Sequence, residues 1–379
     1  MAQVWAVLTR AHPVFAVSPS TSGARLWPTL NRTNPAFLRA GRGPSYIPLR
    51  TVGRARARRR TGGLSSTALS GADLRGTILV RAPLDGADLS GADLTGADLT
   101  GATLIRADLN GADLSWADLT GADLNGATLV RATLADATLN GADLSGATLN
   151  GALLIRADLC SAKLNYATLN GATLNGALLI GTDATGADLH SATLIRADLT
   201  SATLSSADLS GADLHSATLN GADLRGVDLH SATLSKATLQ YTDLIGADLR
   251  SAKLAEADLR SVDLSGADLS GADLRSATLI GADLRSAMLV GADLDGVDLS
   301  DADLSDADLR SADLSGAGGL MLRRLIGVLW SDTTRWPSTG LRTTVLENSE
   351  AVESGLYRVR GEEVEMSVDQ TPLVPAPRL

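Results

Sequence analysis

Cysteine and aromatic residues are scarce in this chain of 379 residues. The single cysteine, Cys160, cannot form an intramolecular disulfide, and one thiol does not make a metal site. Aromatic residues make up 3% of the sequence, which is unlike an ordinary globular domain. No apolar run approaches the ~20 residues that a membrane-spanning helix needs. We expect a protein without a membrane span and, because nothing argues for an oxidising compartment, a cytoplasmic location.

Acidic residues are absent from residues 1–63, which contain eleven arginines. This composition is similar to that of a transit peptide, and it equally suits a disordered arm or a start codon assigned too early. The densest part of the segment holds the candidate basic residues Arg54, Arg56, Arg58, Arg59 and Arg60. They are candidates for contact with nucleic acid, with anionic lipid or with acidic residues of the same chain. We expect a poorly ordered, basic N-terminal arm.

Leucine recurs at every fifth position from residue 69 to residue 314, and Ala184 is the one exception among these fifty positions. Two residues earlier, 43 of the fifty residues are alanine; immediately before the leucine, 29 are aspartate and 13 are threonine. On an α-helix successive leucines would drift by about 140° around the axis, and on a flat strand they would alternate between the two faces. The chain must therefore turn once in every repeat.

Within one unit, such as 71–75, Ala72 and Leu74 lie on one side of an extended segment and Asp73 lies on the other. The next residues, Arg75 and Gly76, fall at a corner, where turn-forming residues are frequent along the chain. Coils stacked at about 4.8 Å pair their backbones and bury leucine and alanine together. We predict a packed interior without a substrate cavity, and aspartate and threonine on the outside.

These units resemble the pentapeptide-repeat family, whose pattern is alanine, aspartate or asparagine, leucine and two variable residues. The resemblance covers residues 64–316 and implies an all-β fold, a right-handed quadrilateral parallel β-helix (a solenoid) with four units per coil. Fifty units would then form about 12 coils. We expect three parts: an N-terminal arm (1–63), the β-helix (64–316), and a C-terminal cap with a flexible tail (317–379).

Residues 317–379 follow the last regular unit. Leu322, Leu325, Ile326 and Leu329 have the spacing of one helix face, which predicts a short helix across residues 320–329. The segment from Trp330 to Pro337 resembles the tail that closes many arrays of this family. An open β-helix end would expose unpaired backbone and core leucines, so we predict a cap. The alternative is a homodimer contact through the same segment.

Outward aspartates recur every twenty residues if a coil has four units. Two candidate partner-binding rows follow on adjacent faces: Asp188, Asp208, Asp228, Asp248 and Asp268 in the first, and Asp223, Asp243, Asp263, Asp283 and Asp303 in the second. Carboxylates stacked in this way repel one another. The bland interpretation is that each aspartate hydrogen-bonds near its corner and keeps the protein soluble.

The acidic faces favour a non-enzymatic scaffold for protein–protein interaction. The resemblance implies an alternative, a mimic of duplex DNA that binds DNA gyrase or a related topoisomerase, as quinolone-protecting relatives do. This chain lacks the long loops that interrupt the array in some of those relatives. This difference counts against assigning their function to this chain. A protein partner is expected in either case.

Catalytic signatures are absent from the sequence, which has no GxSxG motif, P-loop or Rossmann fingerprint. We expect no enzyme activity, no cofactor, no metal and no small-molecule substrate. Side chains at exposed corners are expected for His190, His215, His230, Trp116, Tyr166 and Tyr241. His190 and His230 would share a face at about 10 Å, too far apart to bind one zinc ion.

Overall fold

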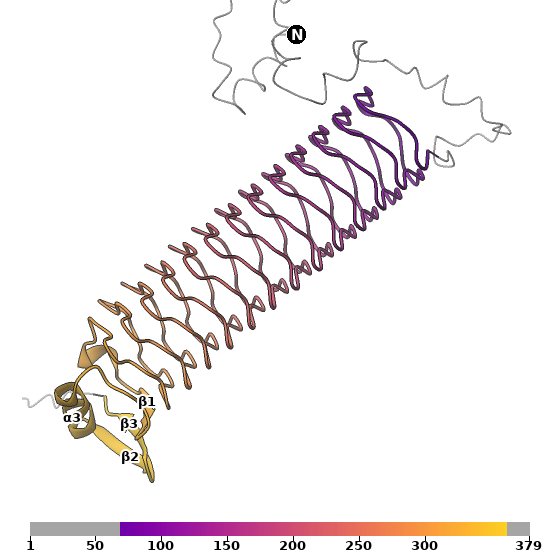
Figure 1. The fold of residues 1–379 in the computed structure, drawn as a ribbon. Helices are drawn as coiled ribbons and strands as arrows, with labels where there is room; N and C mark the ends of the chain where they lie inside the picture. The colour runs from indigo at the N-terminus through magenta and orange to yellow at the C-terminus, as the bar shows by residue number, and fades with distance from the viewer. Residues whose placement is uncertain (1–68, 362–379) are drawn as a thin grey trace, which may run out of the picture. The chain divides into compact units, whose positions relative to one another are not determined.

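The computed structural model describes residues 69–361, all of which belong to one compact unit. Up to residue 317 the backbone alternates single bridged residues with tight turns, five residues at a time. Figure 1 shows these segments as coils stacked one upon the next, from the indigo end to the orange end of the described chain. The basic stretch Arg54–Arg60 lies outside the described residues, so the N-terminal arm stays a prediction.

Parallel bridges set the register of the coils. Each outward residue pairs with the residue twenty positions later, as Asp73 does with Asp93 and Ile78 with Asp98. The backbone N–H of Leu74 donates to the carbonyl oxygen of Asp93 at 2.8 Å, and the N–H of Asp93 donates to that of Ala72 at 2.9 Å. Four five-residue units therefore complete one turn, as the resemblance implies.

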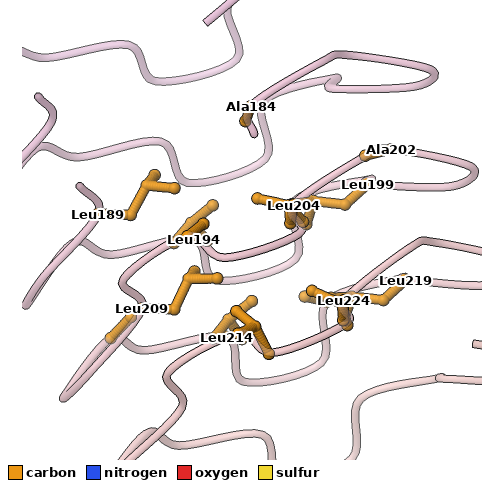
Figure 2. Packing of buried hydrophobic residues seen from close by; sticks show 14 of the residues in the cluster. Ala184, Leu189, Leu194, Leu199, Ala202, Leu204, Leu209, Leu214, Leu219 and Leu224 are labelled. Carbon is orange, nitrogen blue, oxygen red and sulfur yellow. The ribbon is translucent and has the colours of Figure 1, made fainter. Parts of the chain in front are cut away.

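Leucine and alanine fill the interior along the whole array. Leu194 and Leu214, twenty residues apart, are both fully buried, and Figure 2 shows one above the other on the same side of successive coils. Each coil has too few apolar side chains to cover itself, so burial depends on the coils above and below. A fully buried leucine stabilises a fold by roughly 1.5–3 kcal/mol relative to an exposed one.

Two exceptions to the inner pattern lie side by side in the unit 181–185. Ala184 takes a leucine place, and Thr182 takes an alanine place. Both are buried. The Thr182 hydroxyl donates to the carbonyl oxygen of Leu159 at 2.8 Å, so the buried polar group is satisfied.

Each corner needs a residue with left-handed backbone. The first residue of a unit occupies this place, and glycine adopts it without strain, as Gly91 does at a φ of 61°. Many units have another residue here, most often serine; bulkier examples are Trp116 at 62° and Tyr241 at 58°. A φ above zero is rare for bulky residues. The stacked backbone hydrogen bonds hold these residues in place, since Trp116 N–H donates to the carbonyl oxygen of Ala135 at 3.0 Å.

The array continues for one irregular turn beyond Leu314, which lacks the five-residue pattern. The bridge from Asp308 reaches Leu329 and the bridge from Asp313 reaches Arg335, spacings of 21 and 22 residues. Trp330 and Trp336 follow these bridged residues directly, so they take the inward places that leucine holds elsewhere. Both are buried. The array therefore ends on two indole rings.

A small sheet and one helix complete the described C-terminal part. Strand β1 (Leu329–Ser331) belongs to the last turn, and β3 (Leu356–Val359) pairs with it antiparallel. Strand β2 (Ser349–Glu353) pairs with the other side of β3. Helix α3 (Thr339–Glu347) precedes β2 (Figure 1).

The predicted helix across residues 320–329 is wrong. Only the single 3-10 turn η4 (Leu322–Arg324) forms there, and Leu329 lies in strand β1. Of the four residues whose spacing indicated a helix, only Leu325 is fully buried. The backbone pairs with the preceding coil instead of forming a helix, since the Asp306 N–H donates to the carbonyl oxygen of Ile326 at 2.8 Å. The short helix of this region is α3, which begins at Thr339. A homodimer contact through this region stays a prediction.

Candidate acidic interface

The two predicted aspartate rows exist as continuous parallel ladders. Bridges join Asp188, Asp208, Asp228, Asp248 and Asp268 in one row and Asp223, Asp243, Asp263, Asp283 and Asp303 in the other. Neighbouring members of a ladder lie about one strand spacing, ~4.8 Å, apart at the backbone. The register thus brings together the residues that the sequence placed in each row.

Every aspartate in both rows makes the same local hydrogen bond. One carboxylate oxygen accepts from the backbone N–H two residues later, for example at 2.8 Å in Asp208 and 3.0 Å in Asp263. The same contact forms in the other eight members. This bond satisfies a corner amide that the coil leaves without a ladder partner. The aspartates therefore have a structural role at each corner.

Arginine neutralises much of the second row. In this row, the guanidinium two residues later binds Asp223 (from Arg225) and Asp283 (from Arg285), and Arg250 binds Asp248 of the first row in the same way. These hydrogen bonds are the largest cause that lowers the pKa of all three carboxyl groups. Arg225 Nε also lies 3.6 Å from Asp243, and Arg324 Nη1 lies 3.2 Å from Asp303. Within the described residues, only Asp263 of this row has no Lys or Arg within 4 Å.

The first row has a longer stretch without a cationic partner. In the described part of the chain, Asp188, Asp208 and Asp228 have no Lys or Arg within 4 Å, whereas Asp248 and Asp268 both contact Arg250. Three consecutive carboxylates on one face therefore keep their charge available. We call Asp188, Asp208 and Asp228 the open acidic strip.

Histidine and serine occupy the corner beside the open acidic strip. His190 and His230 are exposed there, and the His190 Nδ1 atom lies 2.9 Å from the Ser210 hydroxyl. His215 lies at a different corner and is half-buried. No cluster of three or more His, Cys, Asp or Glu suited to a metal ion occurs among residues 69–361.

The arginine pairs were not predicted from the sequence. Their signal is simple, because an arginine follows an aspartate by two places within one unit. The extended segment points the aspartate outward, and the corner then brings the guanidinium back to it. Seven such pairs form in the array, from Arg75–Asp73 to Arg310–Asp308.

Other exposed or reactive groups stand apart from the strip. Trp116, Tyr166 and Tyr241 are exposed at three different corners, as expected. Burial and the neighbouring Asp158 raise the pKa of the Cys160 thiol to about 11, which keeps it protonated at neutral pH. An open cleft of about 410 Å³ lies between the array and β3, lined by polar and apolar residues that include Met288 and Arg358.

Comparisons with known proteins identify the repeat. The model of "Pentapeptide repeats" matches eight overlapping stretches that together cover residues 67–316. No curated protein matches the chain. No helix within the described residues is long and apolar enough to cross a membrane.

Solved structures with the same repeat resemble the chain to different degrees. HetL, a protein involved in heterocyst differentiation regulation in the cyanobacterium Nostoc, is 36% identical, with a TM-score of 0.51 over 55% of this chain and 92% of HetL. QnrB1, a plasmid-mediated fluoroquinolone resistance protein, is 20% identical, with a TM-score of 0.33 over 53% of this chain and 95% of QnrB1. A protein of the Arabidopsis thaliana thylakoid lumen is 32% identical, with a TM-score of 0.15 over 34% of this chain and 71% of that protein.

The repeat, its four-unit turn and the likeness to HetL agree with one another. The chain belongs to the pentapeptide-repeat family and folds as a right-handed β-helix.

Proposed function

We propose that this chain is a non-enzymatic scaffold of about 12 coils whose acidic face binds a protein partner. The observation that carries the proposal is the open acidic strip, in which Asp188, Asp208 and Asp228 are aligned by parallel bridges and have no Lys or Arg of residues 69–361 within 4 Å. A strip of like charge at one strand spacing costs electrostatic energy in the free protein. A basic partner surface would relieve that cost.

The chemistry of the partner follows from the geometry of the strip. Carboxylates spaced at about 4.8 Å match lysine or arginine side chains on neighbouring strands of a sheet, which have the same spacing, or along a helix face, where residues three or four apart lie about 5–6 Å from each other. Complementary charges accelerate association and select the partner more than they strengthen binding. The likeness to HetL, a protein of a regulatory process, supports a binding role.

A matched pair of variants tests the proposal. In the strip variant, Asp188, Asp208 and Asp228 are each changed to Asn; in the control, the arginine-bound Asp223, Asp248 and Asp283 are changed in the same way. Asparagine keeps the oxygen that accepts the corner N–H, so both variants fold. Affinity capture from the native cells, with mass-spectrometric identification, should recover a partner with the wild type and the control but not with the strip variant. Equal recovery of the partner by all three proteins would show that the open acidic strip is not the binding site.

A duplex mimic that binds DNA gyrase or a related topoisomerase is the second candidate. The aligned aspartate ladders on adjacent faces favour it, because they form parallel lines of negative charge. The arginines along the second row count against it, since they interrupt the charge that a phosphate backbone carries without a break. A supercoiling assay with purified gyrase decides: a mimic inhibits or protects the enzyme at micromolar protein, and the strip variant does so less.

A further inference from the structure

Beyond Arg75, which binds Asp73 and lies 3.4 Å from Asp93, the first coils have few ion pairs compared with the C-terminal end of the array. Within the described residues, Asp98, Asp113 and Asp118 have no Lys or Arg within 4 Å, and Asp108 and Asp123 share this property. Toward the other end, arginine repeatedly pairs with the aspartate of its own unit. The carboxylates of Asp98, Asp113 and Asp118 accept only local hydrogen bonds from their own corners, so their charge is available to a cationic partner.

One corner of this region also carries an exposed indole. Trp116 lies between Asp113 and Asp118 in sequence, and its relative exposure is 49%. The bridges place Asp93 beside Asp113 and Asp98 beside Asp118, so two ladders of carboxylates flank the ring. We call Asp98, Asp113, Trp116 and Asp118 the Trp116 corner.

The indole does not cover the coil before it. The corner residue twenty places earlier is Gly96, and a Cβ atom built there would meet no atom within 4 Å. Corner side chains lie against the following coil instead, as the Tyr166 ring does at 2.7 Å from a Cβ atom built at Gly186; the residue in that position after Trp116 is Asp136. About half of the Trp116 side chain is exposed, so this part of the ring is open to a group from outside the array.

The chemistry of the corner selects a guanidinium group. Arginine stacks on an indole face by a cation–π contact and binds carboxylates through its planar donors at the same time. Lysine offers only a point charge, and a neutral peptide would leave the carboxylates uncompensated. An arginine-rich segment can stack on the indole and bind the carboxylates of the corner at the same time.

We propose that residues 54–60 of the same chain are this segment. The chain before residue 64 contains eleven arginines and no acid, so its charge is complementary to that of the first coils. Fifteen residues separate Arg54 from Leu69, where the described chain begins, and an extended chain of that length reaches about 50 Å. Trp116 lies between two and three coils from Leu69, roughly 11 Å along the stack. The tether raises the effective concentration of the arginines to about the millimolar range.

The contact covers a different part of the array from the open acidic strip, so it holds whether or not a partner binds that strip. Individual exposed ion pairs are weak, and salt screens them. Several weak contacts on one tether add up to a docked arm at low ionic strength. The arm also reduces the negative charge that the first coils present to other molecules.

Limited proteolysis of the full chain tests this proposal. Trypsin cleaves after arginine, so the rate of cleavage at residues 54–60 reports whether these residues are bound. In the corner variant, Trp116 becomes Ser and Asp113 and Asp118 become Asn; serine occupies this corner place in many other units. The matched control changes Tyr241, another exposed aromatic residue at a left-handed corner, to Ser, and Asp243 and Asp258 to Asn.

Cleavage within residues 54–60 should be about threefold faster, or more, in the corner variant than in the wild type at about 20 mM salt. The control should match the wild type. Raising the salt to about 500 mM should accelerate cleavage of the wild type and leave the corner variant unchanged. Thermal unfolding of all three chains checks that the array is intact. Equal cleavage rates in all three chains, or a wild type that is insensitive to salt, would overturn the proposal.

Discussion

The regular array and its last turn follow the same path with different side chains. In the array, inward places hold leucine, and each one packs between equal neighbours above and below. In the last turn the inward places after the bridged residues Leu329 and Arg335 hold tryptophan. Trp330 stacks on Tyr357 with ring centroids 4.5 Å apart and meets Trp336 edge to face at 5.7 Å.

The difference shows what an end of a β-helix requires. A leucine in the middle is covered by two coils, whereas the last turn has a coil on one side only. Larger rings cover more of the exposed core. The indole N–H of Trp330 donates a hydrogen bond to the Ser349 hydroxyl at 3.0 Å. The sheet and helix that follow then cover the rings. Four substitutions or conditions test this comparison.

Replacing Trp330 by Ala should have the largest effect. The fully buried ring would leave a cavity between the last turn and β3, and such changes cost about 3–5 kcal/mol. Chemical denaturation should show this loss of unfolding free energy. Tyr241→Ala is the control, because that ring is 72% exposed and should change stability by less than about 0.5 kcal/mol. A similar loss in both variants would contradict the role of Trp330.

Threonine at an inner place compares the two regions directly. Thr182 in the array and Thr334 in the last turn each donate to a carbonyl oxygen one turn earlier, at 2.8 Å. Thr182→Val should cost about 0.5–1.5 kcal/mol. Thr334→Val should cost more, because the Thr334 hydroxyl also accepts from the Ser331 N–H at 3.0 Å. Thermal unfolding measures both losses of stability. A larger loss for Thr182→Val than for Thr334→Val would show that the last turn does not depend more on its threonine hydroxyl than the array does.

The corner bond of the aspartates should have a smaller effect. Asp208→Ala removes the acceptor of the Ser210 N–H and should cost about 0.5–1 kcal/mol, since water replaces it at the surface. Asp208→Asn keeps the acceptor oxygen and should be close to neutral. If Asn costs as much as Ala in thermal unfolding, the charge and not the hydrogen bond is what stabilises the corner.

Acid should weaken the arginine-paired coils slightly. The pKa of Asp223, Asp248 and Asp283 is lower in the folded chain than its ordinary value, chiefly through hydrogen bonds from arginine. Such groups stabilise the fold above about pH 4, and this stability is lost as the pH falls further through their lowered pKa. Each exposed pair contributes roughly 0–1 kcal/mol.

A titration of the thermal midpoint from neutral to acid pH measures the effect. A variant in which Gln replaces Arg225, Arg250 and Arg285 should lose less stability on acidification than the wild type. An identical pH profile in the two proteins would show that the pairs do not contribute.

The sequence predicted the array well and its end poorly. Strict recurrence of leucine determines which side chains point inward, because only one register buries them all, and the aspartate rows follow from that register. The last turn escaped detection, since Trp330 and Trp336 replace leucine and the spacing grows to 21 and 22 residues. The charge of the rows was also overestimated, because the arginine pairs depend on a corner geometry that spacing alone does not reveal.

The twenty-residue turn has a consequence for how such a chain tolerates insertions and deletions. Removing one whole five-residue unit would keep leucine inward and every ladder hydrogen bond available, so the core would close again without a gap. All surface residues after the deletion would, however, rotate by a quarter turn relative to those before it. Changes in length of five residues can thus exchange one binding face for another while the fold itself stays the same.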